Sequence, residues 1–282
     1  MGKLALGTVQ FGLDYGVTNQ KGQVTIDKVK SILDFAKNNG INTLDTASAY
    51  GDSERVLGRV GGNDFQIITK TISINNGINK VVDGFYQSLE ALNKKQIEGL
   101  LIHNISDIEN TQFNTLFDKL NKLKKEGLIK KIGFSTYIPS QVDFLLSNFD
   151  FDLIQLPFNV FDTRLIEGGQ LQALKDKNIE IHARSVFLQG VLLDFDNLSD
   201  YFSTWKSQFD EYYAMVKESR LSLLEYALNF ALNIKEIDKV LVGVNSERQL
   251  REIVSSVKEQ SDLNAHPIYD EDLLNPSNWG KL

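Results

Sequence analysis

The chain has 282 residues, of which 42 % are hydrophobic and 24 % charged; its net charge is −7 and it has no cysteine. This composition is typical of a globular protein with a large core, and the acidic balance argues against a nucleic-acid partner. Without cysteine, disulfides and thiolate metal sites are excluded. With only three histidines, a histidine-rich metal site is not expected either.

Targeting and membrane signals are also lacking. The sequence has no run of about 18 apolar residues, so we expect no membrane span. Its start, as far as Gly12, is too short and too broken by glycine for a secretory leader. Together with the lack of cysteine, this predicts a cytoplasmic protein, while the oligomeric state is left open.

Apolar runs alternate with helical patterns along the first half of the chain. Strands are expected over 4–7, 41–45, 65–70 and 97–103, with helices over 25–39, 53–60, 79–92 and 111–126. The third helix places Val82, Phe85, Leu89 and Leu92 at helical spacing, so these side chains are expected to face the core. Glycines at 40 and 127 are typical helix ends.

The second half repeats the alternation. Strands are expected over 131–135, 153–157, 179–185 and 239–244, with helices over 140–147, 165–177, 222–233 and 246–258 and an aromatic-rich helix around Trp205. Ser222 and Glu225 form a capping box that opens one of them. Eight apolar strands, each followed by a helix, predict an α/β fold: a single (β/α)8 TIM barrel over residues 1–282, with a tail from about residue 259.

Four reactive side chains stand at or just after the ends of consecutive strands. Asp45, Lys70 and His103 end the second, third and fourth strands, and Tyr50 follows Asp45 by five residues. Carboxyl ends of barrel strands share one mouth, where barrel enzymes carry out their chemistry. Each residue alone also fits a structural role in a turn or at a strand end, but their convergence favours a functional site.

The four residue types together suit acid catalysis on a carbonyl group. An ammonium beside a phenol favours the phenolate, and a carboxylate beside the ammonium keeps it charged. A neutral histidine can orient a substrate oxygen by hydrogen bonding. Such a set protonates a carbonyl oxygen while hydride reaches its carbon, and because no side chain supplies hydride, a nicotinamide cofactor is implied.

From Leu4 to about Lys258 the sequence resembles an aldo-keto reductase. The segments that carry the resemblance are LDTASAYGDSERVLG at 44–58, ITK at 68–70 and LLIHN at 100–104. The resemblance implies Tyr50 as general acid, Asp45 and Lys70 as the groups that tune it, and His103 as the residue that orients the carbonyl. It also implies a small-molecule carbonyl substrate and an extended NADP cofactor across the barrel mouth, with NAD as the alternative.

The resemblance further implies a set of contacts to the nicotinamide. Ser135 and Gln155 match residues that bind the carboxamide, although Thr136 stands where the family usually has asparagine. Arg184 stands where the family often has an aromatic ring against the nicotinamide. A guanidinium plane can also lie against a flat ring, and the alternative for Arg184 is a salt bridge within the mouth.

At the other end of the cofactor, the resemblance points to the start of the last barrel helix. Glu252 matches a residue near the adenine, and the free amides at a helix start suit a phosphate. The full set of expected contacts there is Gly243, Asn245, Ser246, Gln249 and Glu252. An ordinary capped helix is the alternative, and it explains Asn245 and Ser246 without a ligand.

Two other functions stay open at this point. Lys70 could be the nucleophile of a Schiff-base lyase, although a neighbouring Asp45 argues against the neutral amine that such chemistry needs. The barrel could also be a non-catalytic subunit that senses a nucleotide. The tail that holds Trp279 is expected either to fold over the barrel mouth or to pack on the outside of a helix.

Overall fold

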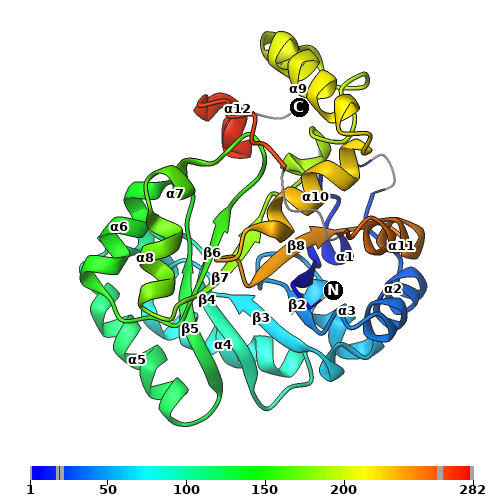
Figure 1. Ribbon diagram of the computed structural model, residues 1–282. Coiled ribbons are helices and arrows are strands. Elements are labelled where there is room, and N and C mark those ends of the chain that lie inside the picture. The colour runs from blue at the N-terminus through cyan, green and yellow to red at the C-terminus, as the bar shows by residue number, and fades with distance from the viewer. Residues whose placement is uncertain (1, 17–18, 20–21, 259–262, 280–282) are drawn as a thin grey trace.

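The computed structural model describes residues 2–16, 19, 22–258 and 263–279. Eight strands form a closed barrel in chain order, with helices around it (Figure 1). The strands are β1 Leu4–Gly7, β2 Thr43–Asp45, β3 Gln66–Lys70, β4 Ile97–Ile102, β5 Ile129–Ser135, β6 Leu153–Pro157, β7 Glu180–Arg184 and β8 Lys239–Gly243. All neighbours are parallel, and β1 pairs with both β2 and β8. The predicted (β/α)8 barrel is therefore confirmed.

Helices follow the strands around the barrel. They are α1 Val9–Gly12, α2 Ile26–Asn38, α3 Ser53–Val60, α4 Ile78–Ala91, α5 Phe113–Lys125, α6 Pro139–Asn148, α7 Arg164–Glu167, α8 Gln170–Asp176, α9 Lys206–Glu218, α10 Leu223–Asn233, α11 Glu247–Ser255 and α12 Glu271–Leu274. Figure 1 shows α9 and α12 beyond the ring formed by the others. Among the described residues, no helix has the length and apolar character needed to cross a bilayer.

Several details differ from the sequence prediction. The helix expected over 165–177 is two helices, because Gly169 between them adopts a left-handed φ of 77°. Val81 rather than Val82 is buried on α4, because Val81 shares a face with Phe85 and Ser88 whereas Val82 lies at the edge of that face. Strand β2 is also shorter than expected and begins at Thr43.

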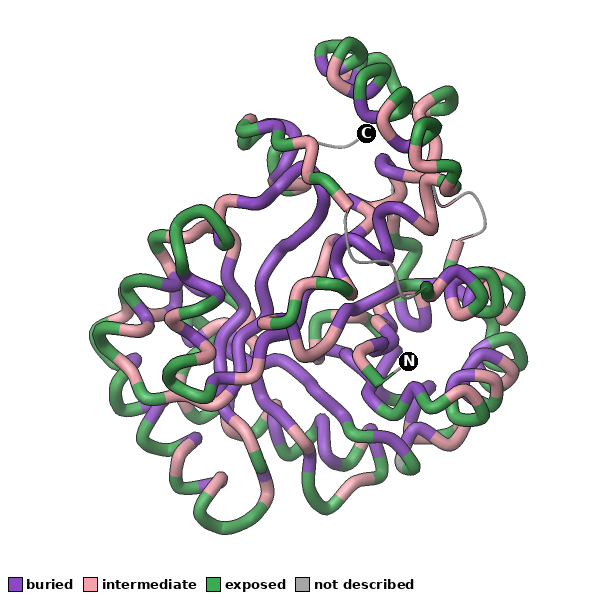
Figure 2. Tube along the Cα trace, viewed as in Figure 1, coloured by how far each residue is buried: buried purple, intermediate pink, exposed green. Residues whose placement is uncertain are grey.

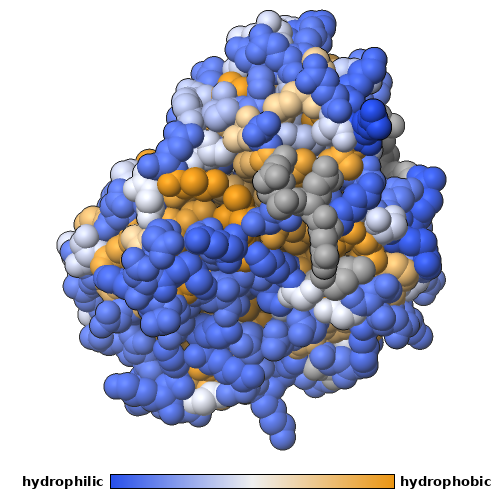
Figure 3. Space-filling view, viewed as in Figure 1, coloured by the Kyte–Doolittle hydropathy of each residue, from blue (hydrophilic) through white to orange (hydrophobic). Residues whose placement is uncertain are grey.

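Apolar side chains fill the barrel and the layer between strands and helices. Ile68, Leu101 and Leu153 form a separate buried cluster, and because β3, β4 and β6 are not all neighbours, this cluster lies in the barrel interior. Figure 2 shows buried residues along the strands and exposed ones on the outer helix faces. Figure 3 shows a mainly hydrophilic surface with an apolar band between α7 and α10.

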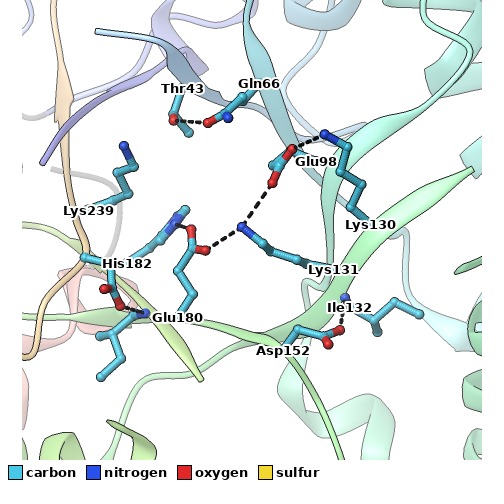
Figure 4. Close-up of polar contacts among 12 residues, drawn as sticks. Thr43, Gln66, Glu98, Lys130, Lys131, Ile132, Asp152, Glu180, His182 and Lys239 are labelled. Atoms are coloured by element: carbon cyan, nitrogen blue, oxygen red, sulfur yellow. Dashed lines mark hydrogen bonds and ion pairs between the residues drawn. The ribbon is translucent and has the colours of Figure 1, made fainter. Parts of the chain in front are cut away.

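A charged network lies at the end of the barrel where the strands begin (Figure 4). Lys131 Nζ is 3.0 Å from Glu98 Oε1 and 2.5 Å from Glu180 Oε2. The other oxygen of Glu180 is 2.7 Å from Nε2 of His182, which has no exposed surface. This network ties together the ends where the strands begin, and the opposite end, where strands finish, is the end at which barrel enzymes carry out their chemistry.

Candidate active site

The four reactive residues of the sequence line one cavity at the carboxyl ends of the strands. Asp45 and Lys70 are the last residues of β2 and β3, His103 follows β4, and Tyr50 lies in the loop between β2 and α3. The cavity has a volume of about 510 Å³. The barrel therefore brings together groups that are as many as 58 positions apart in the sequence, Asp45 and His103.

Lys70 and Asp45 form a buried ion pair. The Lys70 Nζ atom is 2.6 Å from Asp45 Oδ1 and donates a further hydrogen bond of 2.9 Å to the Thr46 carbonyl. Burial lowers the pKa of Lys70, but the adjacent Asp45 carboxylate and the Tyr50 phenol raise it, and the net pKa lies above the usual value. Lys70 is thus held as an ammonium, which is unsuited to Schiff-base formation.

Tyr50 lies between the ammonium and the imidazole. Lys70 Nζ is 5.0 Å from the centre of the Tyr50 ring. The His103 ring meets the Tyr50 ring edge to face, with centroids 6.0 Å apart. Burial, reinforced by the charge of Lys70, lowers the pKa of His103 to about 4, so its imidazole is neutral near pH 7. A neutral imidazole can hydrogen-bond a carbonyl oxygen without competing as an acid.

Close backbone packing holds the Tyr50 loop in place. A side chain at Gly12 would put its Cβ 1.8 Å from the Tyr50 carbonyl oxygen, so only glycine allows α1 to approach this loop. Gly51, the next residue, has a left-handed φ of 55°. At the start of α3, the Ser53 hydroxyl donates to the Thr8 carbonyl at 2.9 Å. The loop is therefore fixed against the first strand.

The cavity also holds most of the residues expected to contact a cofactor. Those that line it are Ser135, Gln155, Arg184, Gly243, Asn245, Gln249 and Glu252. Ser246 is not in the lining. Its hydroxyl accepts a hydrogen bond of 3.3 Å from the Gln249 amide and caps α11. The role of an ordinary helix cap, given above as the alternative, therefore accounts for the position of Ser246.

Two buried polar atoms in the lining fit an extended dinucleotide. Gln10 Oε1 and Asn245 Oδ1 have no hydrogen-bond partner among the described residues. Buried polar atoms normally have partners, so these are places where a ligand can bond. A Cβ at Gly243 would meet the Gln10 side-chain nitrogen at 2.8 Å, so a larger residue at the end of β8 would displace the Gln10 side chain. The lining continues from Tyr50 to Glu252 on α11, so the residues present fit a nicotinamide dinucleotide.

Arg184, the last residue of β7, does not form the salt bridge considered as its alternative role. No ion pair joins it to any residue in the described part of the chain. Its guanidinium carbon instead lies 4.5 Å from the centre of the Tyr137 ring, and Nη2 donates to the Thr136 carbonyl at 2.9 Å. The group is held in place by neutral partners.

Sequence reasoning missed a contact between two loops at the mouth. Gln189 Nε2 donates a 3.0 Å hydrogen bond to the Tyr15 hydroxyl, and both residues line the cavity. Tyr15 follows β1 and Gln189 follows β7. Leu188 and Gln189 both adopt positive φ values, of 45° and 53°, a costly conformation that clusters at functional sites. The sequence signal that could have indicated this contact is an aromatic residue, Tyr15, in the loop after the first strand.

The tail packs away from the cavity. Trp279 is buried, its Nε1 donates to the Leu273 carbonyl at 3.1 Å, and its ring meets Phe202 edge to face with centroids 5.0 Å apart. Within the described tail, residues 263–279, no side chain lines the cavity. Of the two expectations for Trp279, packing on the outside of a helix fits this position, because Phe202 lies in the short helix Asp200–Trp205.

Comparison with known proteins gives one consistent result. The profile of the aldo/keto reductase family matches residues 3–270. L-galactose dehydrogenase from Arabidopsis thaliana is 28 % identical over 86 % of this chain and 82 % of its own length. Aldo-keto reductase YhdN from Bacillus subtilis is 25 % identical over 93 % of this chain and 88 % of its own.

Solved structures share the fold. The holo form of aldo-keto reductase AKR11C1 from Bacillus halodurans has a TM-score of 0.73 at 20 % identity, covering 92 % of this chain and 88 % of its own. The glycerol dehydrogenase AKR11B4 from Gluconobacter oxydans has a TM-score of 0.72 at 21 % identity, with the same coverage of both chains.

Proposed function

The chain belongs to the aldo/keto reductase family, and we propose that Tyr50 supplies the proton when it reduces an aldehyde or ketone with NAD(P)H. The protein is an oxidoreductase that acts on small-molecule carbonyl compounds. The observation that carries the role of Tyr50 is its position. The centre of its ring is 5.0 Å from Nζ of the buried Lys70, and the ring is in edge-to-face contact with His103. A neighbouring ammonium stabilises the phenolate that remains once a phenol has given up its proton.

Each of the other three residues has a distinct part in this proposal. Lys70, charged and anchored by Asp45, stabilises the negative charge that forms on the Tyr50 oxygen as the proton leaves. His103, neutral because of its lowered pKa, donates a hydrogen bond that orients the carbonyl oxygen. A bound nicotinamide supplies hydride to the carbonyl carbon.

We further propose that the remaining lining residues hold the dinucleotide. In this proposal Ser135, Gln155 and one face of Arg184 contact the nicotinamide end, and Asn245, Gln249 and Glu252 contact the other end; their shared position in the lining of one cavity supports it. NADPH is favoured by the resemblance and by the helix start at α11, which suits a phosphate. NADH is the alternative, because the Glu252 carboxylate lines the cavity and would repel the extra phosphate of NADPH. The cation that pairs with Glu252, Arg248 at 3.7 Å, lies outside the lining.

Cofactor titration followed by a carbonyl panel tests the proposal. Quenching of protein fluorescence by NADPH and NADH gives both dissociation constants, and the tighter nucleotide is then used with aldehydes, ketones and sugars. Oxidation of the reduced nucleotide that depends on a carbonyl is expected. Tight binding without turnover on any carbonyl would instead support the nucleotide-sensing alternative. Trapping of a substrate on Lys70 by borohydride would support the lyase.

A further inference from the structure

Arg184 carries a charge that its surroundings do not neutralise. The guanidinium touches the Tyr137 ring, the Thr136 carbonyl and the Ser185 hydroxyl, the last two through hydrogen bonds of 2.9 and 3.2 Å. All three partners are uncharged. A guanidinium has five N–H donors in one plane, and these two bonds use only two of them. The remaining donors are left for other partners in the cavity that Arg184 lines.

The ionisable lining of the cavity leaves a positive charge near the reactive groups. Lys70 and Asp45 cancel each other at 2.6 Å. Glu252 lies on α11 and faces Arg248, which is outside the lining. Among the described lining residues, Arg184 is therefore the cation without a counter-charge beside the catalytic groups. Its charge reaches them, because it contributes to the lowered pKa of His103.

We propose that the carbonyl substrate carries a carboxylate and that the free edge of the Arg184 guanidinium binds it. This rests on the reductase function proposed above. Guanidinium and carboxylate match in shape as well as charge, and their paired hydrogen bonds are stronger than neutral ones. One face of Arg184 is covered by Tyr137, so the group is already oriented and loses little freedom on binding. A single guanidinium suits a monoanion better than a doubly charged phosphate.

Matched substrates test this without any mutation. The carboxylates are glyoxylate, pyruvate and 4-oxobutanoate, and each is compared with its methyl ester, which keeps the carbonyl and removes the charge. For the wild-type protein we expect kcat/KM of at least one acid to exceed that of its ester by about 10- to 100-fold, the size of a hydrogen bond to a charged group. Equal values within every pair would overturn the inference.

Substitutions then assign the preference to Arg184. In Arg184→Gln the ratio of acid to ester should fall to about one, and Arg184→Lys should restore part of it. Because Arg184 is also proposed to contact the nicotinamide, a loss that comes from the cofactor should lower acids and esters alike, so the ratio of acid to ester at saturating nucleotide is the diagnostic quantity. Equal losses for acids and esters, together with weaker nucleotide binding, would mean that Arg184 serves only the cofactor. Arg55→Gln, an exposed arginine on α3, is the matched control and should keep the wild-type ratio.

The outcomes also separate this inference from the reductase function. Turnover of the esters with no preference for acids refutes the carboxylate site and leaves the reductase standing. No turnover on any carbonyl by the folded wild-type protein refutes both. Acid preference that survives in Arg184→Gln, in a variant whose thermal melting matches wild type, refutes the assignment to Arg184.

Discussion

The Gln155 amide donates a hydrogen bond of 2.7 Å to Oδ2 of Asp45, across the barrel from β6 to β2. Lys70 occupies the other carboxylate oxygen at 2.6 Å. Both oxygens of Asp45 are therefore engaged, and the carboxylate cannot rotate away from the ammonium. Because Gln155 uses its nitrogen here, its Oε1 is the atom left to accept a bond from a cofactor amide. One residue thus links the ion pair to the expected nicotinamide position.

Replacing Lys70 by methionine should abolish turnover and spare nucleotide binding. The substitution removes the charge that stabilises the Tyr50 oxygen and leaves Asp45 as a buried carboxylate without its cation. We expect kcat to fall by about 10²- to 10⁴-fold, the range for losing acid–base assistance. Fluorescence titration should give a nucleotide dissociation constant within a few-fold of wild type. A parallel loss of affinity and turnover would show that Lys70 has a different task.

Because the pKa of His103 is lowered, we expect the stability of the folded state to depend on pH. Between its folded pKa of about 4 and the ordinary value of 6.5, the unfolded chain binds more protons than the folded chain. This histidine therefore makes the folded state lose stability as pH falls from 6.5 to 4, by about 1 to 3 kcal/mol. Urea unfolding of wild type and His103→Gln across this range measures the difference. A histidine that titrates near 6.5 by NMR would contradict the buried, neutral imidazole.

Gly12→Ala should destabilise the protein and impair catalysis together. Its Cβ would lie 1.8 Å from the Tyr50 carbonyl oxygen and 2.4 Å from the Ser53 amide, so the backbone of the catalytic loop must shift. Such overpacking typically costs about 1 to 3 kcal/mol. Gly84→Ala is the control, because its Cβ would make ordinary contact at 3.8 Å and α4 would gain helix propensity. Unfolding free energies of both variants test this prediction. A Gly12→Ala protein with the stability and activity of wild type would exclude tight packing between Gly12 and the Tyr50 loop.

The charged network at the start of the strands predicts a loss of stability in acid. Burial raises the pKa of Glu180, but His182 and Lys131 lower it, and the net value is about 2 (Figure 4). A lowered carboxylate pKa stabilises the fold above its unfolded value of about 4.3 and loses that effect as pH falls towards 2. Glu180→Gln should cost about 1 to 3 kcal/mol at pH 7, allowing for screening of this partly exposed group. Its unfolding free energy should also depend less on pH below 4.5.

Glu180→Gln should leave catalysis intact, since the network lies at the opposite end of the barrel from Tyr50. Activity with the best carbonyl substrate at pH 7 is the check. A variant that keeps its stability at every pH, or one that stays folded but loses activity, would show that this end of the barrel has another role.

Much of the site could be predicted because a parallel barrel converts sequence position into spatial position. An apolar run followed by Asp45, Lys70 or His103 specifies a strand end, and all strand ends share one mouth. The side-chain surroundings of Arg184 could not be predicted in this way. Its contact with Tyr137 joins β7 to the loop after β5, and no local pattern encodes such a pair.

Contacts between loops could not be predicted from the sequence either. The bond between Tyr15 and Gln189 depends on backbone with positive φ at a non-glycine residue, which the sequence does not signal. Val81 is buried in place of Val82, because both fit the helical spacing closely and tertiary packing decides which of the two faces the core. Helix boundaries set by tertiary packing are the least predictable feature of a sequence.

Single-turnover reduction by Tyr50→Phe decides whether the Tyr50 hydroxyl is the proton donor. The variant keeps the ring contact with His103 and removes only the oxygen. With nucleotide and carbonyl both saturating in a stopped-flow experiment, we expect nucleotide oxidation to slow by about 10²- to 10⁴-fold at unchanged nucleotide affinity. A rate within a few-fold of wild type would contradict the assignment of Tyr50 as the acid.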